Sequence, residues 1–158
     1  MNGQLLRFEI RDALDLYAAR RGLVEFAAKL QFKSGDGKEL AIVVSELISN
    51  ILKYGTRGNV SFAQVDDERF GRGIRIVAHD EGPPFHDLQL ALRDGYNDRG
   101  PIDPVSLLKR GGLGTGLGAI VRLSDAFEVL PLPDGKDIRV VRFRTRPSHS
   151  KKRPSAGT

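Results

Sequence analysis

The chain contains no cysteine, no tryptophan and one methionine. Without cysteine, disulfide bonds, thiolate metal ligands and thiol nucleophiles are excluded. Its apolar runs fall far short of the roughly 20 residues that a bilayer span needs, so we expect no transmembrane helix. The N-terminus has no charged segment followed by an apolar core, and therefore no sign of a signal peptide. These absences make a cytoplasmic protein the expectation, and apolar and charged contents of 40% and 28% are typical of a globular domain.

Positive charge is in small excess, with 25 Lys and Arg against 20 Asp and Glu, a formal net charge of +5. Three of the cations lie in residues 147–158, which contain no acid, and without them the net charge is +2. We therefore expect one domain over residues 1–146 and a basic, disordered tail over residues 147–158. Nucleic-acid binding through Lys151, Lys152 and Arg153 is the alternative, but a short charge run is more often a solvated end.

Apolar patterns along the chain predict an alternation of strands and helices. Period-two patterns predict strands over residues 5–10, 59–65, 73–80, 127–132 and 137–144. Helical spacing predicts a helix that Asp12 caps and that ends near residue 30, and further helices over residues 37–54 and 116–127. Hairpins with helices grouped between them imply an α+β fold, a two-layer sandwich with a mixed, mostly antiparallel sheet on one side.

Two segments interrupt these patterns. Residues 34–37 (SGDG) are predicted to break the chain before the second helix. Residues 88–94 have a short helical pattern, and residues 95–112, rich in glycine and proline, are predicted to be irregular. Long irregular segments in compact domains are commonly lids, so we expect a mobile lid here.

Glycine is concentrated in one place, with five glycines in residues 111–118, directly before an apolar helical pattern. Backbone without side chains lets successive N–H groups point into one concavity, and a following helix adds a partial positive charge. This combination suits a phosphate. Residues 114–119 formally match the dinucleotide fingerprint G-x-G-x-x-A, but no strand precedes them, and a P-loop motif is absent.

Glu46 and Asn50 lie one helical turn apart and project from one face of the predicted second helix. An asparagine amide oxygen can bind Mg²⁺, which shares its ligand shell with phosphates. A glutamate one turn away can accept a proton from a nucleophile. For this pair taken alone, an ordinary solvated helix face is the alternative.

Asp80 ends an apolar strand and is followed by Glu81 and Gly82. A carboxylate at such a strand end can accept a hydrogen bond from an amino group of a bound ligand, and the amine of adenine fits. The alternative is simpler, because Asp-Glu-Gly-Pro is also good turn chemistry.

Together these segments resemble the nucleotide-binding motifs of one superfamily. Residues 45–54 (SELISNILKY), 78–83 (AHDEGP) and 111–117 (GGLGTGL) are similar, in order and spacing, to the N, G1 and G2 boxes of the GHKL (Bergerat-fold) ATPases. Within that superfamily the chain looks most like the anti-sigma-factor serine/threonine kinases, in the switch-kinase branch of bacterial stress-response modules that work by partner switching. The resemblance covers about residues 5–145.

The resemblance implies an ATP-dependent protein kinase that uses Mg²⁺. Asn50 would bind the metal, and Glu46 would activate the hydroxyl of a protein serine or threonine. Asp80 would accept a hydrogen bond from the adenine amine, with Gly82 leaving room for the ring. The residues that would surround the phosphates are Gly112, Gly114, Thr115 and Gly116.

The resemblance also implies protein partners. The phosphoryl acceptor would be a STAS-domain antagonist, and a phosphatase or a sigma factor would be a further partner of the module. Pro84 departs from the family pattern, which has a second glycine there, and residues 97–110 exceed the short lid of this branch. Because proline fixes φ and lacks an N–H, the alternative is a non-catalytic or weakly ATP-binding switch that acts by binding an anti-sigma partner, a STAS protein or a phosphatase.

Overall fold

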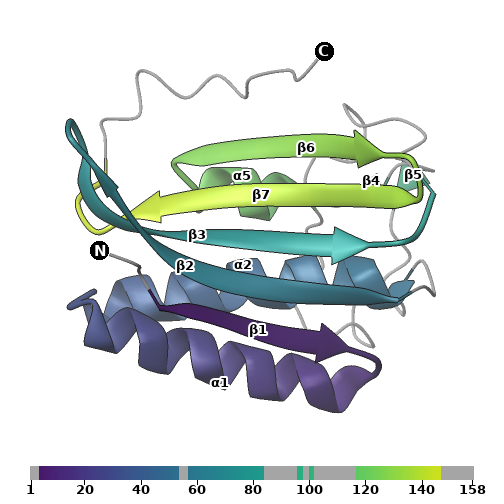
Figure 1. Ribbon diagram of the computed structural model, residues 1–158, viewed down its shortest axis with the longest axis horizontal. Coiled ribbons are helices and arrows are strands. Elements are labelled where there is room, and N and C mark those ends of the chain that lie inside the picture. Colours follow the sequence, from purple (N-terminus) through teal and green to yellow (C-terminus); the bar gives the residue numbers. More distant parts are fainter. Residues whose placement is uncertain (1–3, 54–56, 84–95, 98–99, 102–116, 147–158) are drawn as a thin grey trace.

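The computed structural model describes residues 4–53, 57–83, 96–97, 100–101 and 117–146. Three helices pack on one face of a five-stranded sheet (Figure 1). The strands of this sheet are β1 (Leu5–Ile10), β2 (Gly58–Asp67), β3 (Gly71–Asp80), β6 (Ala126–Leu132) and β7 (Gly135–Phe143). The helices are α1 (Ala13–Lys29), α2 (Ser34–Lys53) and α5 (Leu117–Arg122).

The strand order is β1-β2-β3-β7-β6, and every pairing in this sheet is antiparallel. The predicted α+β two-layer sandwich is confirmed, and the sheet is wholly antiparallel in the described residues. No helix among these residues is both long and apolar enough to cross a bilayer.

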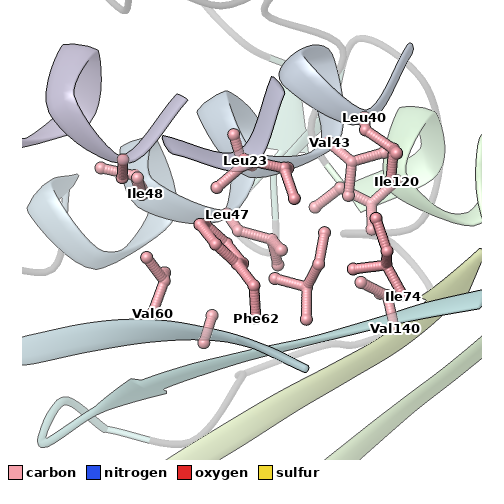
Figure 2. Close-up of a cluster of buried hydrophobic side chains, with 14 of the residues drawn as sticks. Leu23, Leu40, Val43, Leu47, Ile48, Val60, Phe62, Ile74, Ile120 and Val140 are labelled. Carbon is pink, nitrogen blue, oxygen red and sulfur yellow. The ribbon is translucent and has the colours of Figure 1, made fainter. Parts of the chain in front are cut away.

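The core lies between the sheet and the helices. Along β2, β3 and β7, alternate side chains are buried toward the helices, whereas Arg75 and Arg139 on the opposite face are exposed. This alternation is the expected pattern for an antiparallel sheet with one covered face. Figure 2 shows the buried side chains that meet in this layer, among them Leu23, Leu40, Val43, Leu47, Ile48, Val60, Phe62, Ile74, Ile120 and Val140.

Helix α1 begins with the predicted cap. Asp12 Oδ1 accepts a hydrogen bond from the Leu14 N–H (2.9 Å), and Asp15 reaches back to the Asp12 N–H to complete a capping box. The Arg11 N–H also donates to the Asp15 carboxylate (2.8 Å), and this hydrogen bond lowers the pKa of that carboxyl below its usual value.

Helix α2 begins three residues before its predicted start, so the predicted break at residues 34–37 is wrong. The Gly37 N–H donates to the Lys33 carbonyl (3.0 Å) and closes the first turn. The carboxylates of Asp36 and Glu39 bind Arg142 of β7, at 2.9 and 2.6 Å. These tertiary ion pairs hold the first turns helical where the glycines alone favour a break.

Helix α5 ends five residues before the predicted end, and β6 follows after a three-residue turn. Two arginines, at the end of β7 and just after it, donate hydrogen bonds to carbonyl groups that are left unpaired at the end of α5. Arg142 Nη1 donates to the Leu123 carbonyl (2.9 Å). Arg146 Nη2 donates to the carbonyls of Arg122 (3.0 Å) and Ser124 (3.1 Å). The helix therefore stops where these donors meet it.

The segment predicted to be an irregular lid contains a short antiparallel pair, β4 (Tyr96–Asn97) with β5 (Gly100–Pro101). The prediction of wholly irregular chain over residues 95–112 is therefore wrong for these four residues. The rest of that segment, the short helix predicted over residues 88–94 and the predicted tail lie outside the described residues.

Strand β7 begins two residues before its predicted start, because Gly135 and Lys136 join the sheet instead of the turn. Lys136 pairs with Asp80 at the end of β3. A Cβ on Gly135 would lie 2.0 Å from the Asp80 carbonyl oxygen and would clash with it, because a backbone atom cannot move aside as the end of a side chain can. Only glycine lets the two strands approach this closely.

Gly135→Ala should therefore lower the free energy of unfolding by about 1–3 kcal/mol, because the added methyl forces β3 and β7 apart. Gly35→Ala is the matched control, since a Cβ at this position in the exposed first turn of α2 would meet no atom within 4 Å beyond its own stretch of helix. Alanine there should be neutral or stabilising by up to about 1 kcal/mol. Urea unfolding of both variants measures the difference. An unchanged midpoint for Gly135→Ala would contradict the close approach.

Candidate functional site

The end of α2, the start of β2 and the end of β3 meet at one end of the sandwich, on the right in Figure 1. Gly58, the first residue of β2, pairs with Asp80, and a Cβ on Gly58 would lie 2.5 Å from Cγ2 of Ile51. Ile51 of α2 therefore lies against the strand end that carries Asp80. Asn50 directly precedes Ile51, so two of the three predicted nucleotide-binding segments come together.

Asp80 is 1% exposed, and one of its oxygens is fully used. Oδ1 accepts hydrogen bonds from the Gly82 N–H (2.8 Å) and from Lys136 Nζ (3.0 Å). The first of these is the turn chemistry that was the alternative for this motif, and it occupies Oδ1 alone. Oδ2 has no hydrogen bond to the described residues. A second acceptor on the same carboxylate is therefore left for a ligand.

Lys136 is a site residue that the sequence analysis missed. Its side chain is 2% exposed, and besides Asp80 its Nζ donates to the Pro83 carbonyl oxygen (2.9 Å). The signal was present in the alternation of β7, because Ile138 and Val140 face the core and a period of two places Lys136 on the same face. Because the predicted strand began at residue 137, Lys136 was placed in the turn before it and its buried position was not predicted.

Glu46 is 4% exposed, so the alternative of a solvated helix face does not hold for this residue. Asn50 is half-buried, and its Nδ2 is fully buried without a hydrogen-bond partner among the described residues. An unpaired buried amide costs about 1–3 kcal/mol of stability. A bound ligand with a hydrogen-bond acceptor at this position would satisfy the amide.

The chemistry of these donors suits Mg²⁺ held jointly with phosphates. The described residues contain no cluster of three His, Asp or Glu side chains that could hold a metal ion by themselves. Mg²⁺ commonly takes one or two protein oxygens and completes its shell with phosphate oxygens and water. The amide of Asn50 has an oxygen that can bind the metal and an NH₂ group that can donate to a phosphate oxygen.

Gly82 is buried and its N–H donates to Asp80, which is the hydrogen bond of the turn; its predicted role of leaving room for a ring stays a prediction. His79 lies on the opposite face of β3, where its Nδ1 is 2.7 Å from Asp137 Oδ1, away from the covered face. The four predicted phosphate-binding residues lie outside the described residues. They are Gly112, Gly114, Thr115 and Gly116.

Comparison with known proteins gives a consistent result. Residues 9–142 match the family model described as the histidine kinase-like ATPase domain. Serine/threonine-protein kinase RsbT of Bacillus subtilis (strain 168) is 31% identical over 130 residues, which cover 82% of this chain and 89% of that protein. A chain of the SiaB–SiaC complex from Pseudomonas aeruginosa has the same fold, with a TM-score of 0.50, 17% identity and coverage of 87% of this chain and 89% of that one.

If the Asn50 amide is unpaired because it binds a ligand, it lowers the stability of the ligand-free protein. Asn50→Leu should raise the free energy of unfolding by about 1 kcal/mol, because an apolar side chain of similar size removes the buried unpaired donor. Ser45 on the same helix is the control, since its hydroxyl donates to the Ala41 carbonyl (2.7 Å) and Ser45→Ala should give no gain. Thermal and urea unfolding compare the two. A stability loss in Asn50→Leu would show that the amide is satisfied.

Proposed function

The chain belongs to the family of histidine kinase-like ATPase domains and is an RsbT-like partner-switching kinase; from this premise we propose that it transfers the γ-phosphoryl group of ATP to a serine or threonine of a STAS-domain antagonist protein. The observation that carries the proposal is a pair of unfilled groups at one end of the sandwich. The first is Nδ2 of Asn50, which is buried without a hydrogen-bond partner among the described residues. The second is Oδ2 of Asp80, because both hydrogen bonds that the described residues donate to this carboxylate go to Oδ1.

Asp80 selects the base in this proposal. Its Oδ2 accepts a hydrogen bond from the 6-amino group of adenine, and the buried Gly82 beside it leaves room for the ring. Residues Gly112, Gly114, Thr115 and Gly116 surround the phosphates. A run of backbone N–H groups without side chains is a common phosphate-binding device.

Asn50 would hold Mg²⁺, which would supply positive charge to neutralise the phosphates. Glu46 takes the proton of the substrate hydroxyl as that oxygen bonds to the γ-phosphorus and the bond to the β–γ bridging oxygen breaks, releasing ADP. A kinase of this kind works mainly by positioning the phosphoryl group and offsetting its charge. The burial of Glu46 suits a base that must meet its substrate away from bulk water.

A partner protein completes the proposal. The SiaB–SiaC complex contains a chain of this fold, and in this proposal the present chain likewise binds a second protein. Residues 1–146 would be the catalytic domain in the cytoplasm, and residues 147–158 a tail outside it. A phosphatase or a sigma factor of the same module would be the further partner.

Nucleotide binding depends on Asn50 and Asp80 in this proposal. Asn50→Ala and Asp80→Asn should each weaken Mg·ATP binding at least about tenfold, because each removes a charge-assisted contact. Asp66→Asn is the control, since this carboxylate lies on the exposed β2–β3 hairpin at the other end of the sheet. Calorimetric titration of ATP, with and without Mg²⁺, gives the affinities. Wild-type affinity in both site variants would remove the assigned roles.

Phosphoryl transfer depends on Glu46. Glu46→Gln should keep ATP affinity but slow transfer of radiolabelled phosphate to a purified STAS-domain protein by about 10²–10⁴-fold, the usual contribution of a positioned base. Glu25→Gln, an exposed glutamate of α1, is the control. Equal rates for Glu46→Gln and wild type would refute the assignment. A wild-type protein that binds its STAS partner without transferring phosphate would instead favour the non-catalytic switch.

A further inference from the structure

Lys136 has no role in the proposed function so far, although it lies in the middle of the site. Its Nζ contacts Asp80 Oδ1 at 3.0 Å and the Pro83 carbonyl oxygen at 2.9 Å. One ammonium from β7 therefore holds both ends of residues 80–83. This segment is where the proposed function places the adenine ring.

The contacts of Lys136 decide which oxygen of Asp80 a ligand meets. Oδ1 is held from two sides, by the ammonium and by the Gly82 N–H at 2.8 Å. The carboxylate cannot rotate without breaking both contacts, so Oδ2 is the oxygen that stays available. A carboxylate held in this way accepts hydrogen bonds and donates none.

A stability role alone explains this pair poorly. Replacing a buried ion pair by apolar side chains of similar volume is commonly neutral or stabilising. Both side chains here are 2% exposed, so the pair is of this kind. A buried pair at the end of a strand, beside an unused acceptor, is better explained by what it presents to a ligand.

We propose that Lys136 is a positioning residue that sets the base selectivity of the nucleotide site. By holding Asp80 as a fixed acceptor, it makes the site take a purine nucleotide with an amino group at carbon 6. A purine with a carbonyl at that carbon places its oxygen, an acceptor, against Oδ2 of Asp80, also an acceptor. No hydrogen bond forms between them, and the site binds this purine more weakly. This inference rests on the proposed function, because it needs Asp80 to face the base.

The test compares the affinities of ATP and inosine triphosphate, whose base has a carbonyl in place of the amine, for the full-length protein with Mg²⁺. Wild type should prefer ATP at least about tenfold. Lys136→Met, which keeps the length of the side chain but removes its donors, should bring the two affinities within about threefold. Lys136→Gln keeps an N–H donor and should retain most of the preference. The exposed Lys29→Met is the control and should leave the ratio unchanged.

Lys136→Met leaves the Asp80 carboxylate buried without its cation, so a second comparison is made in an uncharged background. Adding Lys136→Met to Asp80→Asn removes both charges. Because Lys136 acts through Asp80, this addition should leave the ATP-to-inosine-triphosphate ratio of Asp80→Asn unchanged. Thermal unfolding of each variant separates lost stability from lost selectivity.

The outcomes distinguish this inference from the proposed function. A Lys136→Met protein that binds ATP with the wild-type ratio overturns the role of Lys136 and leaves the kinase proposal standing. A change of ratio when Lys136→Met is added to Asp80→Asn overturns it as well, since Lys136 would then act on the base directly. A wild-type protein that binds neither nucleotide overturns both.

Discussion

The buried ion pair between Asp80 and Lys136 is the contact on which the end of the domain with the candidate site depends. It joins the end of β3 to the start of β7, and the absence of a side chain at Gly135 lets the two strands come close enough to form it. With both side chains 2% exposed, loss of either partner leaves an uncompensated charge, at a cost of about 3–5 kcal/mol. The same contact fixes the direction of the Asp80 carboxylate.

Helix α2 carries the other polar side chains of the candidate site. A one-sided antiparallel sheet needs helices on its apolar face, and α2 fills that place with its buried row of leucines, valines and isoleucines (Figure 2). Ile51 of the same helix lies against the strand end beside Gly58, and Asn50 directly precedes it. One helix therefore contributes both to the core and to the candidate site, and the unpaired amide of Asn50 lowers the stability of the ligand-free protein.

Much of this arrangement could be predicted from the sequence, because it follows from local patterns. The five strands, the Asp12 cap and the facing of Glu46 and Asn50 all arise within a few residues of the chain. Strands β2 and β3 extend two residues further into their hairpin than predicted. Three other boundaries that were wrong depend on distant partners. The start of α2 depends on Arg142, more than 100 residues away, and the end of α5 depends on Arg146, while the start of β7 depends on Asp80. Local propensity cannot register a partner from a distant strand.

The anchoring of α5 has a consequence for the glycine run that precedes it. Arg142 and Arg146 hold the carbonyls at the end of this helix, and Arg146 is in turn held by Asp125, which is 1% exposed (3.1 Å). The glycine run thus leads into a helix that is tethered to the sheet. A chain segment with one end already tethered has fewer conformations to lose on capturing a ligand than one that is free at both ends. In the proposed phosphate-binding role, the entropic penalty of ordering this backbone around a ligand would be correspondingly smaller.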